Sequence, residues 1–201
     1  MNEIANFNKR RRVLRLAAYS TAALMTPSAL WASTNSAQIY SWYGRALGAE
    51  TSIQLYHHQK EEAENILKEA VAIIRKYEAI FSLFDDNSEV ARLNKAGKLD
   101  RPSAEFIKLI TISQNFSHQT DGAFDISIQP LWNLYKNHFS NNNQLDLNEQ
   151  ISHVIGSVGW QNISVDHGKI AFKKPTMSVS FNGIAQGYIT DKVTEFLSSQ
   201  G

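Results

Sequence analysis

The 201-residue sequence contains no cysteine. Disulfide bonds, thiolate catalysis and cysteine-bound metal sites are therefore excluded, whatever compartment the protein occupies. The chain also lacks internal repeats and low-complexity linkers. Hydrophobic residues make up 43% of the sequence, an ordinary share for a folded protein, so length and composition predict one domain with its own core.

No apolar run reaches the length of a membrane span, which needs about 20 consecutive apolar residues. The best candidate, Leu16 to Trp31, is interrupted by polar residues and a proline, and it follows the basic cluster Lys9 to Arg12. With the pair Arg10-Arg11, this arrangement resembles a twin-arginine export signal. We therefore predict a twin-arginine-type signal peptide over residues 1–32 and a periplasmic location. The alternative is a basic amphipathic anchor that stays uncleaved.

Positive charge is scarce outside this segment. Residues 1–32 hold five of the 20 Lys and Arg residues but one of the 19 Asp and Glu residues, so the remainder carries a net charge of about −3. A weakly acidic domain gives no reason to expect nucleic acid or an anionic membrane surface as a partner.

Apolar periodicity and capping residues predict several helices. Glu61 to Phe81 repeats apolar residues at three- and four-residue steps, Ser88 is positioned to begin a short helix after a polar turn, and Pro102-Ser103 opens another helix. Asp146 and Glu149 form a capping-box pattern. The predicted helices span Glu61 to Phe81, a short segment from Ser88, Pro102 to about Gln119, Asn148 to Val158, and a final helix from Ile184.

Alternation of apolar and polar residues predicts strands between these helices. The predicted strands are Ile39–Tyr43 and Thr51–Tyr56, separated by a glycine break from Gly44 to Gly48, then Phe124–Ile128, and a hairpin over Ile163–Phe172. His138 to Gln144 is predicted to be a polar loop. His57, His58, His153 and His167 are interpreted as surface residues, because no metal ligands recur at suitable spacing. The pattern predicts an α+β domain with an antiparallel sheet and packed helices.

The stretch SVSFNGIAQGYITD, Ser178 to Asp191, carries the most chemical information. Val179 and Phe181 alternate with serines as in a short strand, Asn182-Gly183 forms a turn, and helical spacing begins at Ile184. The first N–H groups of a helix have no partner within it, so an anion can bind at this junction. The alternative is a plain strand-to-helix connection in which the glycines serve geometry only.

Four stretches, in this order, together resemble the FAD:protein FMN transferases, or ApbE-like family. They are ALGA (46–49), FSLFDDNSEVARLN (81–94), QTDGAFDISIQPLWNLY (119–135) and SVSFNGIAQGYITD (178–191). The resemblance covers about Tyr40 to the C-terminus. It implies an ApbE-like fold and Mg²⁺-dependent transfer of FMN from FAD to a threonine of an exported or membrane flavoprotein, with AMP released. Membrane association is then expected only through the acceptor or an uncleaved signal.

The resemblance also implies which residues contact the flavin nucleotide. Leu47 and Phe84 take the apolar and aromatic positions that lie on the flavin, and Ala123, Phe124 and Asp125 take positions that touch FAD. From the residues alone, Phe84 is equally well interpreted as a core residue, and Asp125 is better interpreted as the cap of a turn. No catalytic residue is assigned.

The last stretch departs from the family pattern in its polar groups. Ser180 and Gln186 stand near the flavin nucleotide, where the family usually has Asp and Lys, so they offer hydrogen bonds without charge. The main-chain carbonyl of Gly183 is the implied Mg²⁺ ligand from this segment. A backbone oxygen is kept whatever side chain stands there.

The family continues beyond this helix into segments that complete the Mg²⁺ site, and these segments have no counterpart before Gly201. One carbonyl cannot hold an ion that prefers octahedral oxygen ligands. We therefore expect residues 33–201 to be the N-terminal part of a flavin transferase domain whose C-terminal part is missing. The alternatives are a non-catalytic FAD-binding module and an exported FAD pyrophosphatase in which water replaces the threonine.

Overall fold

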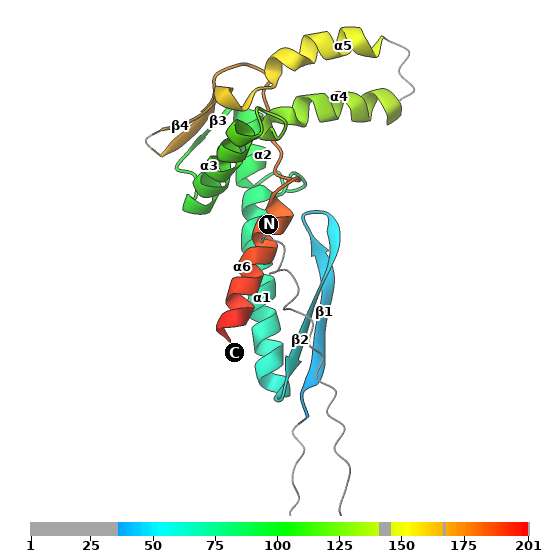
Figure 1. The fold of residues 1–201 in the computed structure, drawn as a ribbon, viewed down its shortest axis with the longest axis vertical. Helices are drawn as coiled ribbons and strands as arrows, with labels where there is room; N and C mark the ends of the chain where they lie inside the picture. The colour runs from blue at the N-terminus through cyan, green and yellow to red at the C-terminus, as the bar shows by residue number, and fades with distance from the viewer. Residues whose placement is uncertain (1–35, 141–145, 167, 201) are drawn as a thin grey trace, which may run out of the picture. The chain divides into compact units, whose positions relative to one another are not determined.

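The computed structural model describes residues 36–140, 146–166 and 168–200. The predicted signal peptide and His167 lie outside the described residues, so both interpretations stay predictions. Ser36–Gly201 form one compact unit. Figure 1 labels its helices and strands.

The first two predicted strands are confirmed, and the structure pairs them as an antiparallel hairpin. β1 (Gln38–Ala46) and β2 (Ala49–His57) pair along their whole length, and the two-residue turn Leu47-Gly48 has φ angles of 49° and 82°. Positive φ at both positions matches the right-handed twist of the strands. The predicted glycine break is confirmed at Gly48 and is wrong at Gly44, because Gly44 pairs with Thr51 in the ladder and the Trp42 ring fills the space beside it.

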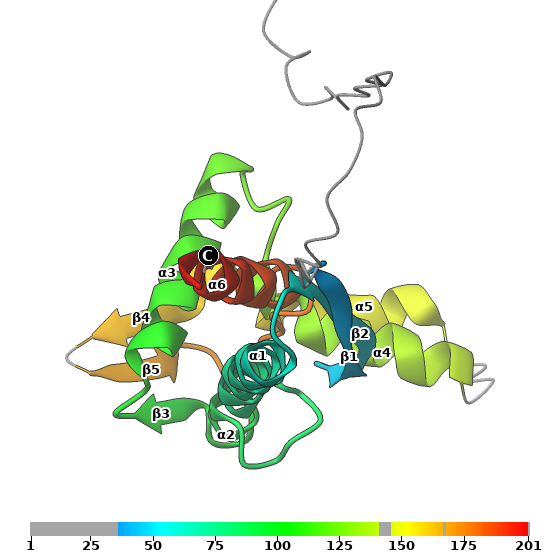
Figure 2. The same ribbon diagram turned by 90° about the horizontal axis from the view of Figure 1, so that it is seen from below.

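The long amphipathic helix is confirmed as α1 (Lys60–Phe81). Its buried face follows the predicted helical spacing: Ala63, Leu67, Ala70, Ile74, Tyr77, Ile80 and Phe81. The hairpin and α6 (Ala185–Ser199) both contact α1. Figure 2 looks along α1 and shows α6 and the hairpin packed around it. The hairpin and α6 therefore share α1 as the helix on which both pack.

Two further helices begin at capped serines, as predicted. In α2 (Glu89–Ala96) the Ser88 Oγ accepts the Ala91 N–H at 3.1 Å, and in α3 (Ala104–Gln119) the Ser103 Oγ accepts the Phe106 N–H at 3.2 Å. These bonds satisfy N–H groups that have no partner inside the helix. The helix starts are therefore set by local sequence.

A second, three-stranded antiparallel sheet has the order β3-β5-β4. β4 (Ile163–Asp166) and β5 (Lys169–Phe172) form the predicted hairpin. β3 (Lys98–Asp100) adds a short edge that the sequence pattern did not indicate, because three residues are too few to show alternation.

The predicted strand Phe124–Ile128 is wrong. The structure has a short 3₁₀ helix, η1 (Ile126–Ile128), which leads directly into α4 (Gln129–Ser140). Asp125 caps η1, because its Oδ1 accepts the Ser127 N–H at 2.7 Å. Pro130 lies in the first turn of α4, where a missing N–H costs nothing. His138–Ser140 belong to α4 and not to the predicted loop, whose remaining residues, 141–144, lie outside the described ranges.

The polar cap predicted at Asp146 is confirmed, since its Oδ1 accepts the Asn148 N–H at 2.8 Å. The helix that it begins, α5 (Leu147–Val154), is shorter than predicted. Its last residues tighten into η2 (Ile155–Ser157), and η3 (Trp160–Asn162) precedes β4. Such 3₁₀ endings are common where a helix leaves its packing surface.

The strand predicted at Ser178–Phe181 does not form. Val179 and Phe181 are fully buried, so the alternation is real, but the segment's backbone bonds an Asn94 side chain and the Ile126 carbonyl instead of a neighbouring strand. The predicted turn and helix follow it, and α6 begins at Ala185.

The core is one cluster in which Phe81, Phe106 and Phe181 meet with ring centroids 5.4–6.1 Å apart. Tilted and edge-on aromatic contacts of this kind add to the free energy gained by burying apolar area. Among the described residues, no helix combines the length and apolarity required to cross a membrane. The α+β class with antiparallel sheets and packed helices is confirmed, although the strands divide into two small sheets.

Candidate functional site

The start of α6 is bordered by two pockets, and most of the predicted site residues line one or the other. We call the first the aromatic pocket, with a volume of about 540 Å³. Its lining residues come from the segment before α4, from α4 and from the segment before α6: Gly122, Ala123, Phe124, Asp125, Ile126, Ile128, Gln129, Leu131, Trp132, Tyr135, Ser180, Asn182 and Gly183. Five predicted residues, Ala123, Phe124, Asp125, Ser180 and Gly183, therefore meet in one place.

Asp125 holds one wall of the aromatic pocket in shape. Its Oδ1 accepts from both the N–H and the Oγ–H of Ser127 at 2.7 Å, and its Oδ2 accepts the Trp160 N–H at 3.0 Å. The Ser127 Oγ in turn accepts the Gly159 N–H at 2.7 Å. Both carboxylate oxygens therefore serve the fold, as expected for the turn cap that the residues alone favoured.

Phe124 connects the two sides of the aromatic pocket. Its ring contacts Phe116 edge-on with centroids 6.2 Å apart, and its Cε2 lies 3.6 Å from the place where a Gly183 side chain would begin. The turn before α6 thus lies against the ring. Trp132 and Tyr135 from α4 add two more aromatic side chains, which gives the pocket flat, apolar walls with a few polar groups between them.

The main chain around Ser180 is held by hydrogen bonds. The Ser180 N–H donates to the Ile126 carbonyl at 2.8 Å, and its Oγ accepts the Asn182 N–H at 3.3 Å. The Phe181 carbonyl accepts from the N–H groups of Ile184 and Ala185 at 2.9 and 2.7 Å. The positive end of the α6 macrodipole lies at this turn.

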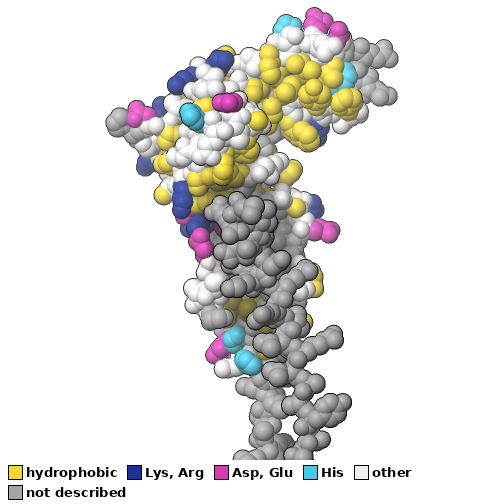
Figure 3. Space-filling view, in the orientation of Figure 1, with side chains coloured by type: hydrophobic (Ala, Val, Ile, Leu, Met, Phe, Trp, Pro, Cys, Tyr) yellow, Lys and Arg dark blue, Asp and Glu magenta, His cyan; other side chains and the backbone are white. Residues whose placement is uncertain are grey.

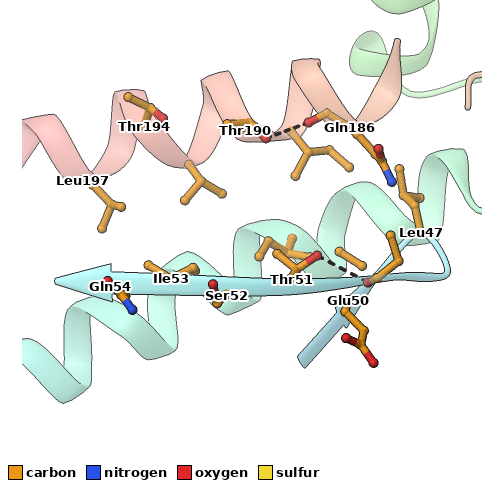
Figure 4. A pocket seen from close by; sticks show the side chains of 15 residues that line it. Leu47, Glu50, Thr51, Ser52, Ile53, Gln54, Gln186, Thr190, Thr194 and Leu197 are labelled. Atoms are coloured by element: carbon orange, nitrogen blue, oxygen red, sulfur yellow. Dashed lines mark hydrogen bonds between the residues drawn. The ribbon is translucent and has the colours of Figure 1, made fainter. Parts of the chain in front are cut away.

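The second pocket, the hairpin pocket, lies between β2 and α6 and has a volume of about 440 Å³. Leu47 and Gln186 line it from opposite sides, as Figure 4 shows. Leu47 is buried, and its N–H donates to the Glu78 Oε1 at 2.9 Å, which attaches the turn to α1. Threonines 51, 190 and 194 border an apolar floor that includes Ile53, Ile74, Ile189, Val193 and Leu197.

Phe84 lies apart from both pockets. Its side chain is 75% exposed, so it is not a core residue, and its ring lies against Gly48 in the hairpin turn. The structure therefore brings five of the predicted residues into the aromatic pocket, places Leu47 and Gln186 in the hairpin pocket, and leaves Phe84 beside the turn that carries Leu47.

Sequence reasoning did not single out Trp132 and Tyr135. Their spacing of three residues places them on one face of α4, and this spacing is the signal that identifies them once α4 is known to be a helix. Figure 3 shows hydrophobic side chains gathered over α4, where Trp132 and Phe139 are 61% and 69% exposed. An exposed aromatic group beside a pocket is typical of a binding surface.

Tyr188, in the GYITD part of the last stretch, is attached to α3. Its hydroxyl donates to the Glu105 carboxylate, and its ring meets Tyr77 and Phe81 edge-on with centroids 5.7 and 6.1 Å away. Burial of the phenol raises the pKa of Tyr188, and the hydrogen bond to Glu105 and the negative charge of that residue raise it further. The tyrosine is therefore a neutral structural donor.

Metal ligands are not gathered at either pocket. Within the part of the chain that the structure describes, no group of three or more His, Cys, Asp or Glu side chains is arranged to hold a metal ion. The Gly183 carbonyl offers one oxygen, and Mg²⁺ prefers six in near-octahedral array. The described residues alone therefore do not fit a Mg²⁺ site.

Curated proteins with similar sequences are FAD:protein FMN transferases. The protein of that name from Klebsiella pneumoniae (strain 342) is 25% identical over 170 residues, which cover 81% of this chain and 51% of the relative. The one from Haemophilus influenzae (strain ATCC 51907 / DSM 11121 / KW20 / Rd) is 27% identical over 145 residues, covering 67% and 41%. The chain spans about half the length of the curated relatives it matches.

Solved structures share the fold. The apo form of the flavinyl transferase ApbE from Pseudomonas stutzeri superposes with a TM-score of 0.68 at 23% identity, covering 83% of this chain and 55% of that one. The ApbE protein from Thermotoga maritima has a TM-score of 0.68 at 25% identity, covering 81% and 53%. The ApbE family model matches residues 47–201, which include every residue that lines the aromatic pocket and all but Ala46 of those that line the hairpin pocket. Because that match extends over most of the sequence, this chain belongs to the ApbE family.

Proposed function

We propose that this chain acts in the transfer of FMN from FAD to a threonine of an exported or membrane flavoprotein, with release of AMP. The names of its curated relatives support a FAD-dependent transferase. The predicted signal peptide supports a periplasmic site of action, and the weakly acidic composition of residues 33–201 gives no reason to expect nucleic acid as a partner.

The aromatic pocket is the observation that carries this proposal. A pocket of about 540 Å³ has the size of small-molecule sites, and the rings of Phe124, Trp132 and Tyr135 suit a flat aromatic ligand such as a flavin. Its other wall is the turn at Asn182-Gly183, which faces the positive end of α6. One end of the pocket thus favours a ring system, and the other favours a phosphate.

The proposed reaction is a phosphoryl transfer. The threonine oxygen forms a bond to the phosphorus of the FMN half, the bridging P–O bond of the pyrophosphate breaks, and AMP leaves with that electron pair. The hydroxyl proton passes to a base or to solvent. The chain contributes by orienting FAD and by directing the positive end of the α6 dipole toward the phosphates, since positioning and charge stabilisation dominate such reactions.

Mg²⁺ dependence forms part of the proposal, because a divalent ion neutralises pyrophosphate charge during such transfers. Gly183 is the proposed main-chain ligand. The described residues do not supply the remaining oxygen ligands, so no step of the reaction is assigned to the ion.

A mass-spectrometric assay of the full chain tests the proposal. The chain is incubated with FAD, with and without Mg²⁺, and with a threonine-containing peptide from an exported flavoprotein; the same peptide with alanine at the threonine is the control. An FMN adduct on the threonine peptide supports transfer. Free FMN plus AMP instead indicates a pyrophosphatase, and binding without turnover indicates a FAD-binding module. Absence of any change on flavin titration overturns the proposal for this chain.

A further inference from the structure

The side chain of Asn94 bonds both backbone groups of one distant residue, Val179. Its Nδ2 donates to the Val179 carbonyl at 2.9 Å, and its Oδ1 accepts the Val179 N–H at 2.7 Å. A neighbouring β-strand satisfies an extended residue in the same way. Among the residues that the structure describes, no strand pairs with this segment, and the asparagine takes that place.

Asn94 is itself held by a well-anchored helix. It lies in the last turn of α2, whose residues Val90 and Leu93 are fully buried. At the other end of α2, the Ser88 Oγ caps the helix and donates to the Ser82 carbonyl at 2.6 Å. The Asn94 side-chain amide is therefore held in a fixed position relative to the core, because α2 cannot shift without breaking these contacts.

The constraint at Val179 extends directly to the aromatic pocket. The next residue, Ser180, is bonded on the opposite edge to the Ile126 carbonyl at 2.8 Å. The segment is thus held from both sides, as a central strand is. Beyond it, the Phe181 carbonyl accepts the N–H groups that open α6. Ser180 and Gly183 line the pocket, whereas Asn94 is not among its lining residues.

We propose that Asn94 is the positioning residue of the aromatic pocket. By bonding Val179, it sets the segment from Ser180 to Gly183 at the distance from Phe124 that a flavin nucleotide requires. This role rests on the proposed function, because it assigns the bound nucleotide to that pocket. Asn94 acts through the backbone and does not contact the ligand.

Two measurements on the full chain test this role. Hydrogen exchange of peptides covering residues 177–187 measures how firmly Asn94 holds this segment. Fluorescence titration with FAD measures the affinity of the aromatic pocket for FAD. Replacing Asn94 with alanine (Asn94→Ala) is expected to speed exchange in that segment and to raise the Kd for FAD about tenfold. The matched control is Gln114→Ala, which removes a similar side-chain bond, from Nε2 to the Ile163 carbonyl at 2.9 Å, far from the segment in sequence.

The control is expected to lower the melting temperature without changing exchange at 177–187 or the Kd for FAD. Wild-type exchange or wild-type FAD affinity in Asn94→Ala overturns the proposal, and so does an equal loss of FAD affinity in Gln114→Ala. If Asn94→Ala does not fold, Asn94→Asp keeps the acceptor for the Val179 N–H and loses the donor, and the same criteria apply. If the wild-type chain binds no flavin, the proposed function fails, while the exchange data still decide whether Asn94 holds the segment.

Discussion

The ring of Phe84 lies over the backbone of Gly48. A Cβ atom added at Gly48 would stand 2.7 Å from the Phe84 Cε2, although the two residues are 36 positions apart. This contact joins the hairpin turn that carries Leu47 to the loop after α1, and it leaves most of the Phe84 side chain exposed. Phe84 therefore lies on the same side of α1 as the hairpin, and its exposed ring is available to a ligand or partner.

Substitution of Gly48 by alanine is expected to displace the Phe84 ring. The φ of 82° makes any side chain unfavourable, at a cost of about 1 kcal/mol in the free energy of unfolding. Gly97→Ala is the matched control, because Gly97 has a φ of 69° but nothing lies within 4 Å of its added Cβ. Chemical denaturation is expected to show a similar loss for both variants. FAD affinity is expected to stay at the wild-type value in both variants, because Phe84 does not line the aromatic pocket. A weaker FAD affinity in Gly48→Ala alone would show that Phe84 contributes to the binding site.

Replacement of Trp132 by alanine is expected to weaken FAD binding. Trp132 forms one aromatic wall of the pocket. Losing the free energy of one aromatic pair corresponds to a Kd for FAD that is about threefold to tenfold higher. Phe139→Ala removes another exposed aromatic side chain from α4, one that does not line the pocket. Fluorescence titration of the two variants separates a pocket effect from a general effect on α4. Equal affinities would exclude Trp132 from the binding site.

Removal of the Asp125 side chain is expected to act first on stability. Asp125→Ala breaks the cap on Ser127 and the bond to the Trp160 N–H, so we expect a loss of about 2 to 3 kcal/mol in the free energy of unfolding. Asp86→Ala, in an exposed turn, provides the comparison and is expected to cost less than about 0.5 kcal/mol. Urea denaturation measures both. A small loss for Asp125→Ala would contradict its role as a structural cap.

Alkaline pH is expected to destabilise the fold through Tyr188. Burial and Glu105 raise the pKa of this phenol above its usual value, so the folded state favours the protonated form. The stabilisation is fully present below the unfolded-state pKa of about 10 and declines as the pH rises toward the higher folded-state value. Tyr188→Phe is expected to cost about 1 kcal/mol at neutral pH, because the bond to Glu105 is lost.

The variant is also expected to show a shallower loss of stability above pH 10. Some dependence remains, because burial also raises the pKa of Tyr77. Denaturation curves between pH 8 and pH 11 measure the slope, and absorbance of tyrosinate separates Tyr188 from the exposed Tyr43 and Tyr56. An unchanged slope in Tyr188→Phe would contradict the assignment.

Much of the fold follows from local patterns in the sequence. The apolar spacing of α1, the serines at positions 88 and 103, and the Asp146 cap predict helix positions because each acts within one or two turns. The hairpin of β4 and β5 is also a local feature. The four family stretches, in turn, identify Ala123, Phe124, Asp125, Ser180 and Gly183, which the fold brings into one pocket.

The predictions are wrong where contacts between residues distant in the sequence override the local apolar pattern. Phe124, Ile126 and Ile128 alternate like a strand, but the Asp125 carboxylate bonds Ser127 and Trp160 and bends the chain into a 3₁₀ turn. The residues that the resemblance assigns to the flavin nucleotide are also divided between two pockets. Leu47 and Gln186 lie in the hairpin pocket because the hairpin and α6 both pack on α1.

The sequence by itself determined most of the helices, the β4–β5 hairpin and the family resemblance, because periodicity, capping and motif order are properties of short segments. The tertiary structure alone decided how Val179 is held, since its hydrogen-bond partner lies 85 residues away in α2. It also decided which side chains share a pocket with Ser180. Backbone groups in a buried extended segment must find partners somewhere in the fold, and only packing determines which ones they find.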